Sequence, residues 1–367
     1  MAVDPRLDTW LSVLHDCEGT DILLTAGSRP LMRIDGSLSP LESAAVLSGE
    51  EIEQIARQLL DERAGEDLRG GGDIDLTFSW RESDRIRGNV FYQRNTCSIS
   101  LRRIPMDIPT PLELGLPTAL SSLLRSPSGL ILVTGPTGSG KSTSMASMVD
   151  VINRNRACHI VTIEDPIEYL HHNHRSAVSQ REVGTDTASF DLALKSVLRE
   201  DPDVVLIGEM RDLESISSAV TIAETGHIVI TTLHTNDSAQ AIDRIVDAYP
   251  SGRRSQIQVQ LAGTLLAVLY QRLVPRIGGG LVAAYELMVG TPAVRNLIRE
   301  GKTRQLRNIL STHRSEGMQT IEQSLSQLID EGVIAYESAL DASLYPQDIV
   351  RPDPSSPRPD GSVAPVR

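Results

Sequence analysis

Residues 132–148, LVTGPTGSGKSTSMASM, decide the fold of the larger part of this chain. Within them, residues 135–142 match the pattern GxxxxGK followed by Ser or Thr, after an apolar run and before a helical one. Glycines let backbone N–H groups surround a phosphate, and the N-terminal end of the next helix adds a positive potential. We expect Lys141 to reach the β- and γ-phosphates of a nucleoside triphosphate and Ser142 to hold Mg²⁺. The phosphate-contacting residues that the motif predicts are Gly135, Pro136, Thr137, Gly138, Ser139, Gly140, Lys141, Ser142 and Thr143.

The sequence around this loop has the pattern of an α/β domain. From about residue 119 the apolar runs GLILVTG, HIVTIED, VVLIGE and HIVITTLHT alternate with helical segments. Such runs indicate parallel strands that are buried on both faces of a sheet. After residue 255 the pattern is largely helical, and we expect helices in SQIQVQLAGTLLAVLYQRL, TPAVRNLIREG and GMQTIEQSLSQLIDEG.

The N-terminal part has a different pattern. Residues 5–16 carry apolar side chains at helical spacing, and a second helix follows Ser48, an N-cap with Glu51 three residues later. The runs DIDLTFSW, RIRGNVFYQR and TCSISLRRIP alternate apolar and polar residues in the manner of strands. We therefore predict an α/β protein with four parts: an α+β domain (1–105), a proline-rich linker (106–118), a phosphate-loop domain with C-terminal helices (119–345) and a disordered tail (346–367).

Composition excludes several classes of protein. The net charge of −13 argues against nucleic acid as the main partner, because a nucleic-acid-binding face is basic. Cys17, Cys97 and Cys158 form no CxxC pair, which argues against a four-cysteine zinc site and favours a reducing cytosol. No apolar run approaches the ~20 residues of a membrane span, so we expect any membrane contact to come through a partner.

Two carboxylates follow apolar strands at the edge where α/β proteins bind ligands. Glu209 ends the run VVLIGE, where it could support Mg²⁺ or orient water, with a surface carboxylate at a strand end as the alternative. Glu164 ends the run HIVTIE and could act as a general base toward water. Helix capping before Pro166 is an equal alternative for Glu164.

Histidines and arginines supply the remaining candidates. His227 and His234 bracket the strand IVITTL, so they cannot share one metal ion, and His234 emerges where it could sense the γ-phosphate. The HHNHR segment at residues 171–175 is expected to be a solvated loop rather than a zinc site. Arg85, Arg87, Arg94, Arg102 and Arg103 crowd the last strands of the first domain. They are either solvated strand faces or charges offered to a phosphate by another domain or subunit.

The ordered set GPTGSGKST, TIEDPIEY, LREDPDVVLIGEMRD and AETGHIVITTLHTNDSAQAIDRIVD resembles the secretion ATPase superfamily. Within it, the motif GEMRD and the segment TPAVRNLIRE are similar to those of the PilT-type retraction ATPases of type IV pili, with Val294 in place of an isoleucine. This resemblance implies a PAS-like N-terminal domain followed by a RecA-like ATPase domain with a helical C-terminal subdomain.

The resemblance also implies roles for single residues. Glu164 matches the carboxylate that activates water, and Glu209 matches an atypical Walker-B glutamate that supports Mg²⁺. His227 and His234 match a histidine pair at the nucleotide. Arg87 and Arg102 match the N-domain arginines that reach the nucleotide.

At the level of the whole protein, the resemblance implies a cytoplasmic homo-hexamer at the inner face of the cytoplasmic membrane. It would use ATP and Mg²⁺ to power pilus retraction and twitching motility by acting on the pilus platform protein, with a second retraction ATPase as a further partner. The alternatives are a PilU-like accessory ATPase or a nucleotide-binding regulatory subunit with little hydrolysis. A DNA translocase or a metabolite kinase fits less well, because the chain is acidic.

Overall fold

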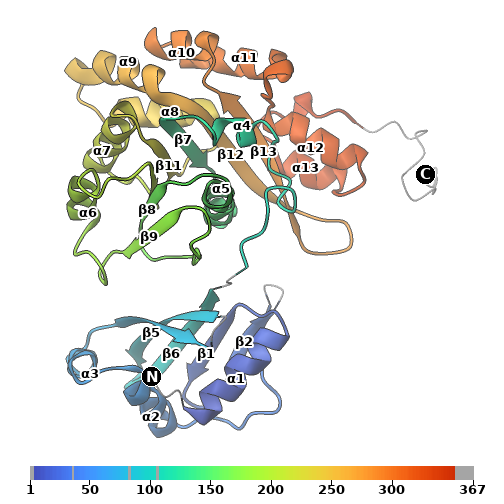
Figure 1. Cartoon of the computed structure of the whole chain (residues 1–367). Helices are drawn as coiled ribbons and strands as arrows, with labels where there is room; N and C mark the ends of the chain where they lie inside the picture. The colour runs from blue at the N-terminus through green and yellow to red at the C-terminus, as the bar shows by residue number, and fades with distance from the viewer. Residues whose placement is uncertain (1–3, 35–36, 82–83, 105–106, 352–367) are drawn as a thin grey trace, which may run out of the picture. The chain divides into compact units, whose positions relative to one another are not determined.

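The computed structural model describes residues 4–34, 37–81, 84–104 and 107–351. The described residues divide into two compact units, with the boundary between Asp107 and Ile108 (Figure 1). Each unit has its own hydrophobic core. Across these residues the helices are too short or too polar for any of them to cross a membrane.

The first unit packs helices against an antiparallel sheet. Over the described residues this sheet has six strands in the order β3-β2-β1-β6-β5-β4. Leu7, Leu11 and Leu14 face the core from α1, and Ser48 forms the predicted capping box with Glu51 at the start of α2. The predicted α+β character of this part is confirmed. Its elements are α1 (Pro5–Asp16), β1 (Asp21–Thr25), β2 (Leu31–Ile34), β3 (Ser37–Pro40), α2 (Gly49–Leu59), α3 (Glu62–Arg69), β4 (Ile74–Trp80), β5 (Asp84–Gln93) and β6 (Thr96–Ile104).

The second unit is built on a larger sheet, with seven strands over the described residues in the order β13-β12-β7-β11-β10-β8-β9. Neighbouring strands from β12 to β9 are parallel, and β13 runs antiparallel to β12. The strands are β7 (Gly129–Thr134), β8 (His159–Glu164), β9 (Ala177–Glu182), β10 (Val204–Ile207), β11 (Ile228–Leu233), β12 (Leu265–Pro275) and β13 (Leu281–Val289). The helices are α4 (Leu120–Leu123), α5 (Lys141–Asn155), α6 (Phe190–Val197), α7 (Leu213–Glu224), α8 (Ser238–Asp247), α9 (Arg254–Thr264), α10 (Pro292–Arg299), α11 (Leu306–Thr312), α12 (Ile321–Asp330) and α13 (Tyr336–Ala342).

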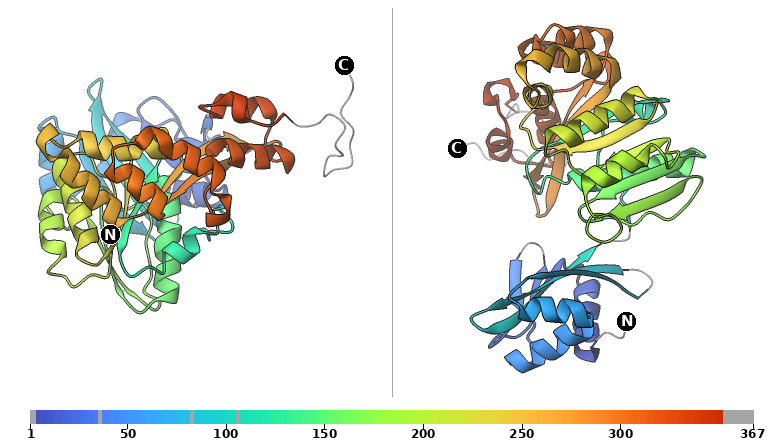
Figure 2. Two further views of the ribbon diagram at one scale, coloured as in Figure 1. Left: turned by 90° about the horizontal axis from the view of Figure 1, so that it is seen from above. Right: turned by 90° about the vertical axis from the view of Figure 1, so that its left-hand side faces the viewer.

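Helices cover both faces of this sheet, as the continuous apolar strands predict. Leu130 and Leu132 of β7 pack into a cluster with α6, α7, α8 and α9. Ile131 and Val133, which point the other way, pack into a cluster with α4 and α5. Helices α9, α10 and α11 lie along one side of the unit (Figures 1 and 2). The predicted α/β fold class is confirmed.

The prediction of a largely helical region after residue 255 is wrong in part. Helices α9, α10 and α12 are where the pattern placed them, but α9 ends at Thr264 and LLAVLYQRLVP forms β12. This strand lies between β7 and β13 and is buried on both faces, so its apolar residues do not alternate. A run of that kind cannot be told from a buried helix by its periodicity.

The predicted start of the disordered tail at residue 346 is too early. Pro346–Asp348 form a 3₁₀ turn, and Ile349 packs in the cluster of α12 and α13. Residues 352–367, the rest of the predicted tail, lie outside the described residues.

The described part of the proline-rich segment, residues 107–118, has no helix or strand, and from Ile108 on it belongs to the second unit. Leu116 is buried in the cluster around α4 and α5, and the Tyr285 hydroxyl donates to the Leu114 carbonyl at 2.9 Å.

Candidate active site

The phosphate loop joins β7 to α5, as its motif predicts. Gly138 and Gly140 have φ values of 77° and 83°, a region that side chains disfavour. At Gly135 a Cβ atom would lie 2.3 Å from the Gln271 carbonyl oxygen, so only glycine allows the loop to pass β12 so closely. The backbone path of the loop therefore favours glycine at these three positions.

Lys141 begins α5 and turns back over the loop. Its Nζ donates to the carbonyls of Gly135 at 3.0 Å and Pro136 at 2.9 Å, and the residue is only 8% exposed. Burial lowers the pKa of Lys141, while the charges of Glu209 and Glu168 act in the opposite direction. The Lys141 ammonium is therefore partly shielded from water, and the negative charge of Glu209 stabilises its charged form.

The carboxyl ends of β8, β10 and β11 bring the other candidates to the same edge. Ile207 pairs with Ile163 on one side and with Thr231 on the other, so the residues that follow these strands emerge together. There, the Glu209 carboxylate contacts His234 Nε2 at 3.2 Å and Arg211 Nε at 2.8 Å. Burial lowers the pKa of His234, and the Lys141 charge lowers it further.

Glu164 is held by hydrogen bonds at the end of β8. Its carboxylate accepts from the Thr162 hydroxyl at 2.7 Å and from Gln180 Nε2 at 3.3 Å, and the Glu168 N–H contacts it at 3.5 Å. Burial raises the pKa of Glu164 to about 6, although these hydrogen bonds act in the opposite direction. A carboxylate with such a pKa can accept a proton near neutral pH.

The structure places His227 at the opposite end of β11 from this edge, and its predicted role at the nucleotide stays a prediction. His227 precedes β11 and His234 follows it, so the six-residue strand separates them by roughly 20 Å. The His227 ring contacts the Ile222 carbonyl at 2.9 Å and Thr225 Oγ1 at 3.1 Å, an arrangement that fixes the turn between α7 and β11.

Arg87 and Arg102 belong to the first unit, where they are paired across β5 and β6. Arg102 is exposed and forms an ion pair with Asp21 at 2.8 Å. Their predicted role at the nucleotide stays a prediction.

Sequence reasoning does not single out several residues near the site, although Tyr169 closes the motif TIEDPIEY. The Tyr169 hydroxyl lies 2.9 Å from Thr143 Oγ1 of the loop, and Gln180 holds both Glu164 and the Tyr169 carbonyl. Gln271 donates from Nε2 to the Ser139 carbonyl at 2.5 Å. A polar pair, QR, inside the apolar run LLAVLYQRLVP is the one feature that could have drawn attention to Gln271.

Metal-binding candidates fall into two sets. Ser142 and Glu209 offer hydroxyl and carboxylate oxygens, the ligands that Mg²⁺ prefers, at the edge where Lys141 lies. At HHNHR, the part of the chain that the structure describes has no group of three His, Cys, Asp or Glu residues able to hold a metal ion. His171 is partly buried rather than solvated, and burial lowers its pKa to about 4.

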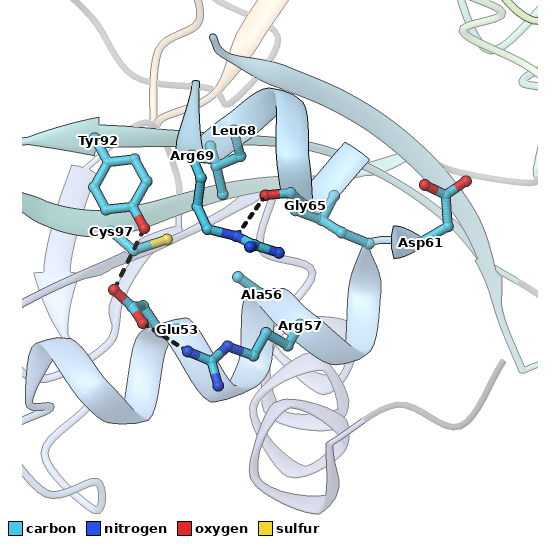
Figure 3. Close-up of a pocket in the computed structure, with 10 residues that line it drawn as sticks. Glu53, Ala56, Arg57, Asp61, Gly65, Leu68, Arg69, Tyr92 and Cys97 are labelled. Carbon is cyan, nitrogen blue, oxygen red and sulfur yellow. Dashed lines mark hydrogen bonds and ion pairs between the residues drawn. The ribbon is translucent and has the colours of Figure 1, made fainter. Parts of the chain in front are cut away.

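A pocket of about 200 Å³ is lined by residues of the first unit, between α2, α3 and the strands β5 and β6 (Figure 3). At its mouth Glu53 accepts hydrogen bonds from Arg57 at 3.1 Å and from Tyr92 at 3.4 Å, so the opposite charges are paired. Burial raises the pKa of Cys97 in its lining to about 11, which keeps the thiol protonated and weakly nucleophilic. The predicted site residues lie elsewhere, so this pocket is not part of the candidate active site.

Comparison with known proteins gives a consistent family. The profile of the family described as type II/IV secretion system protein matches residues 112–279. The chain is 42% identical over 329 residues to the type IV pilus retraction ATPase PilT of Pseudomonas aeruginosa, covering 90% of this chain and 95% of PilT. It is 41% identical over 331 residues to the type IV pilus ATPase PilU of the same organism, covering 90% of this chain and 86% of PilU.

A solved structure agrees with these relatives. The fold is similar to the crystal structure of the pilus retraction motor PilT with bound ADP, with a TM-score of 0.88 and 44% identity over 94% of this chain and 98% of that chain. The phosphate loop, Glu164, Glu209 and His234 all fall within the range that the family profile matches. The chain therefore belongs to the type II/IV secretion ATPases and, within them, to the group that contains PilT and PilU.

Proposed function

We propose that this protein is a hexameric motor that hydrolyses ATP to power the retraction of a type IV pilus. The observation that carries the proposal is the set of groups at one sheet edge. Lys141 and Glu209 influence each other electrostatically, Glu209 contacts His234, and Glu164 lies at the end of the strand beside β10. The likeness to PilT extends over both units, which supports a shared activity.

Each group at this edge has a defined task in phosphoryl transfer to water. The amides of the phosphate loop and Lys141 hold the β- and γ-phosphates. Glu164 accepts a proton from a water molecule while the water oxygen attacks the γ-phosphorus in line. The bond from this phosphorus to the bridging oxygen then breaks, and ADP and inorganic phosphate leave. His234 orients the Glu209 carboxylate from the opposite side to Arg211.

Ser142 and Glu209 are the residues that would hold Mg²⁺, because they offer oxygen ligands of the preferred type. When bound there, Mg²⁺ would offset the negative charge that develops on the phosphate oxygens. The Glu209 side chain is 23% exposed, so it is not closed off from solvent.

Arg87 and Arg102 would supply further positive charge to the same phosphates from the first unit of a neighbouring copy. In a closed ring, each copy offers one nucleotide site and one pair of arginines, so six copies complete six sites. Hydrolysis at each interface would then be coupled to a movement of one copy against the next.

The motor would act in the cytoplasm, at the inner face of the cytoplasmic membrane. Its partners would be the inner-membrane platform protein of the pilus and a second retraction ATPase, with membrane contact only through these proteins. Nucleic acid is not a partner in this proposal, because the chain carries a net charge of −13.

A PilU-like accessory ATPase is the second candidate, since the identities to PilT and PilU differ by a single percentage point over the same share of the chain. An accessory or regulatory subunit would bind ATP but hydrolyse little of it alone. The purified wild-type ring distinguishes the two candidates by its ATP turnover in the absence of other proteins.

Two variants test the proposed activity. Lys141→Ala and Glu209→Gln should each lower Mg²⁺-dependent ATP turnover at least about 100-fold, because the first removes a positive charge from the phosphates and the second removes a proposed Mg²⁺ ligand. Lys302→Ala is the matched control, since Lys302 pairs only with Glu300 on the surface among the described residues. Wild-type turnover in both site variants would overturn the proposal. In cells, loss of the gene should increase surface filaments and abolish twitching, and the Lys141→Ala gene should not restore it.

A further inference from the structure

A glutamine outside the phosphate-loop motif contacts both ends of that loop. Strand β12 runs parallel to β7 and pairs with it as far as Thr134, its last residue. Gln271 is the next residue of β12, and its carbonyl oxygen lies 2.3 Å from where a Cβ on Gly135 would be. The backbone of the loop therefore leaves the sheet in direct contact with Gln271.

The side chain of Gln271 reaches the other end of the loop. It is 1% exposed, and its Nε2 donates to the Ser139 carbonyl oxygen at 2.5 Å. The same nitrogen lies 3.2 Å from where a Cβ on Gly140 would be. Gln271 thus contacts Gly135, Ser139 and Gly140 from the side of the sheet.

This hydrogen bond fixes the direction of one peptide unit. The Ser139 carbonyl and the Gly140 N–H belong to the same planar trans peptide, so they point in opposite directions. When the carbonyl is held toward β12, the N–H is turned away from β12. Gly140 has a φ of 83°, and glycine lets the peptide before it rotate at little steric cost, so the loop itself does not set this direction.

We propose that Gln271 is a positioning residue that orients the Gly140 N–H toward the nucleotide phosphates. Without the Gln271 donor, the Ser139–Gly140 peptide can rotate and turn a carbonyl oxygen toward the phosphates in place of an N–H. The proposal rests on the phosphate loop being the nucleotide site. It adds a residue of β12, outside the loop motif, that controls the affinity of that site.

Gln271→Met tests this, because methionine keeps the length of the side chain and removes the donor. We expect the dissociation constant for a fluorescent ADP analogue and the KM for ATP to rise about tenfold. The reason is that the Gly140 N–H no longer donates to a charged phosphate. The kcat should fall less than the KM rises, since Lys141 and Glu209 remain. Gln327→Met is the matched control: Gln327 is exposed on α12 and donates only to Glu331 among the described residues.

A second variant and a structural readout complete the test. Gln271→Leu also removes the donor and carries no polar atom in the side chain, so its affinity for ADP should fall at least as far as that of Gln271→Met. A crystal structure of Gln271→Met should show the Ser139 carbonyl rotated. Unchanged ADP affinity in both folded variants, judged by wild-type circular dichroism, would overturn the inference. Wild-type turnover in Lys141→Ala would instead overturn the proposed function, so the two failures are distinguishable.

Discussion

At the scale of the residue, Glu164 links the proposed activity to pH. Burial raises the pKa of Glu164 to about 6, and the Thr162 hydroxyl is the strongest of the hydrogen bonds that oppose this effect. Thr162→Val removes that donor at a buried position with little change in shape. The charged form of Glu164 then loses support, and its pKa should rise by roughly one further unit, since one unit corresponds to about 1.4 kcal/mol.

The measurement is the pH dependence of kcat/KM, which reports the pKa values of the nucleotide-free protein. A general base works only when charged, so turnover falls as the pH drops through the pKa of Glu164. The acid limb should therefore lie near pH 6 in the wild type and about one unit higher in Thr162→Val. Thr231→Val is the control, because this buried threonine of the nearby β11 has a hydroxyl without a hydrogen-bond partner among the described residues. Identical acid limbs in all three proteins would remove Glu164 from the role of base.

The candidate residues that the sequence predicts follow parallel strands, and the structure explains why they lie at one edge. Glu164, Glu209 and His234 end neighbouring strands, and a parallel sheet in register gathers such residues at one edge. Residues that reach the site from a separate partner strand could not be identified in this way. Gln271 contacts the loop across a pairing that spans more than a hundred residues of sequence, which no local pattern contains.

At the scale of the element, a buried ion pair holds the C-terminal helices together. Glu322 of α12 is fully buried and contacts Arg307 of α11 at 3.0 Å. It also accepts from the Ser343 hydroxyl at 2.9 Å, just after α13. Glu322→Ala should lower the free energy of unfolding by about 3 kcal/mol, because it leaves Arg307 with the exposed carboxylate of Asp348 and the ring of Tyr345.

Chemical denaturation of the whole protein measures this change through the unfolding transition of the second unit. Glu331→Ala is the control at the end of the same helix, where the side chain is exposed and should change the free energy by no more than about 0.5 kcal/mol. Equal stability of the two variants would mean that the helices are held by apolar packing alone.

The same helices show where element prediction from sequence ends. Amphipathic segments such as α10 and α12 were located because one face is apolar and the other polar. The sequence pattern predicts a continuation of α9 where β12 lies, because both faces of this strand are buried. The tail was placed too early for a related reason. Ile349 is a lone apolar residue in a polar run, and only α12 and α13 show what it packs against.

At the scale of the whole molecule, the hydrophobic pattern of the sequence separates the two parts of the chain, because their strands are buried on one face in the first part and on both faces in the second. The first unit has an antiparallel sheet with one buried face, and its strands alternate apolar and polar residues. The second has strands with apolar residues on both faces.

The assembly of copies leaves no such pattern in the sequence. The hexamer, and the copy from which the arginines come, are therefore proposals. Light scattering should give a mass of about 240 kDa for a ring of six 40.0 kDa chains.

Mixing two inactive variants tests whether the arginines act between copies. Arg87→Ala lacks a charge from the first unit, and Lys141→Ala lacks the phosphate-binding amine of the second, so each ring alone should be inactive. If each site takes its lysine from one copy and its arginine from the next, about a quarter of the sites in rings reassembled from an equal mixture have both, and turnover returns in proportion. A mixture of Lys141→Ala with Glu209→Gln should not recover turnover. Both residues of a site come from the second unit of the same copy, so every site in this mixture lacks one of them. If Arg87 instead served the nucleotide of its own copy, every site in the first mixture would lack one group and turnover would stay absent. Recovery therefore requires that the ring, rather than the single chain, forms the active site.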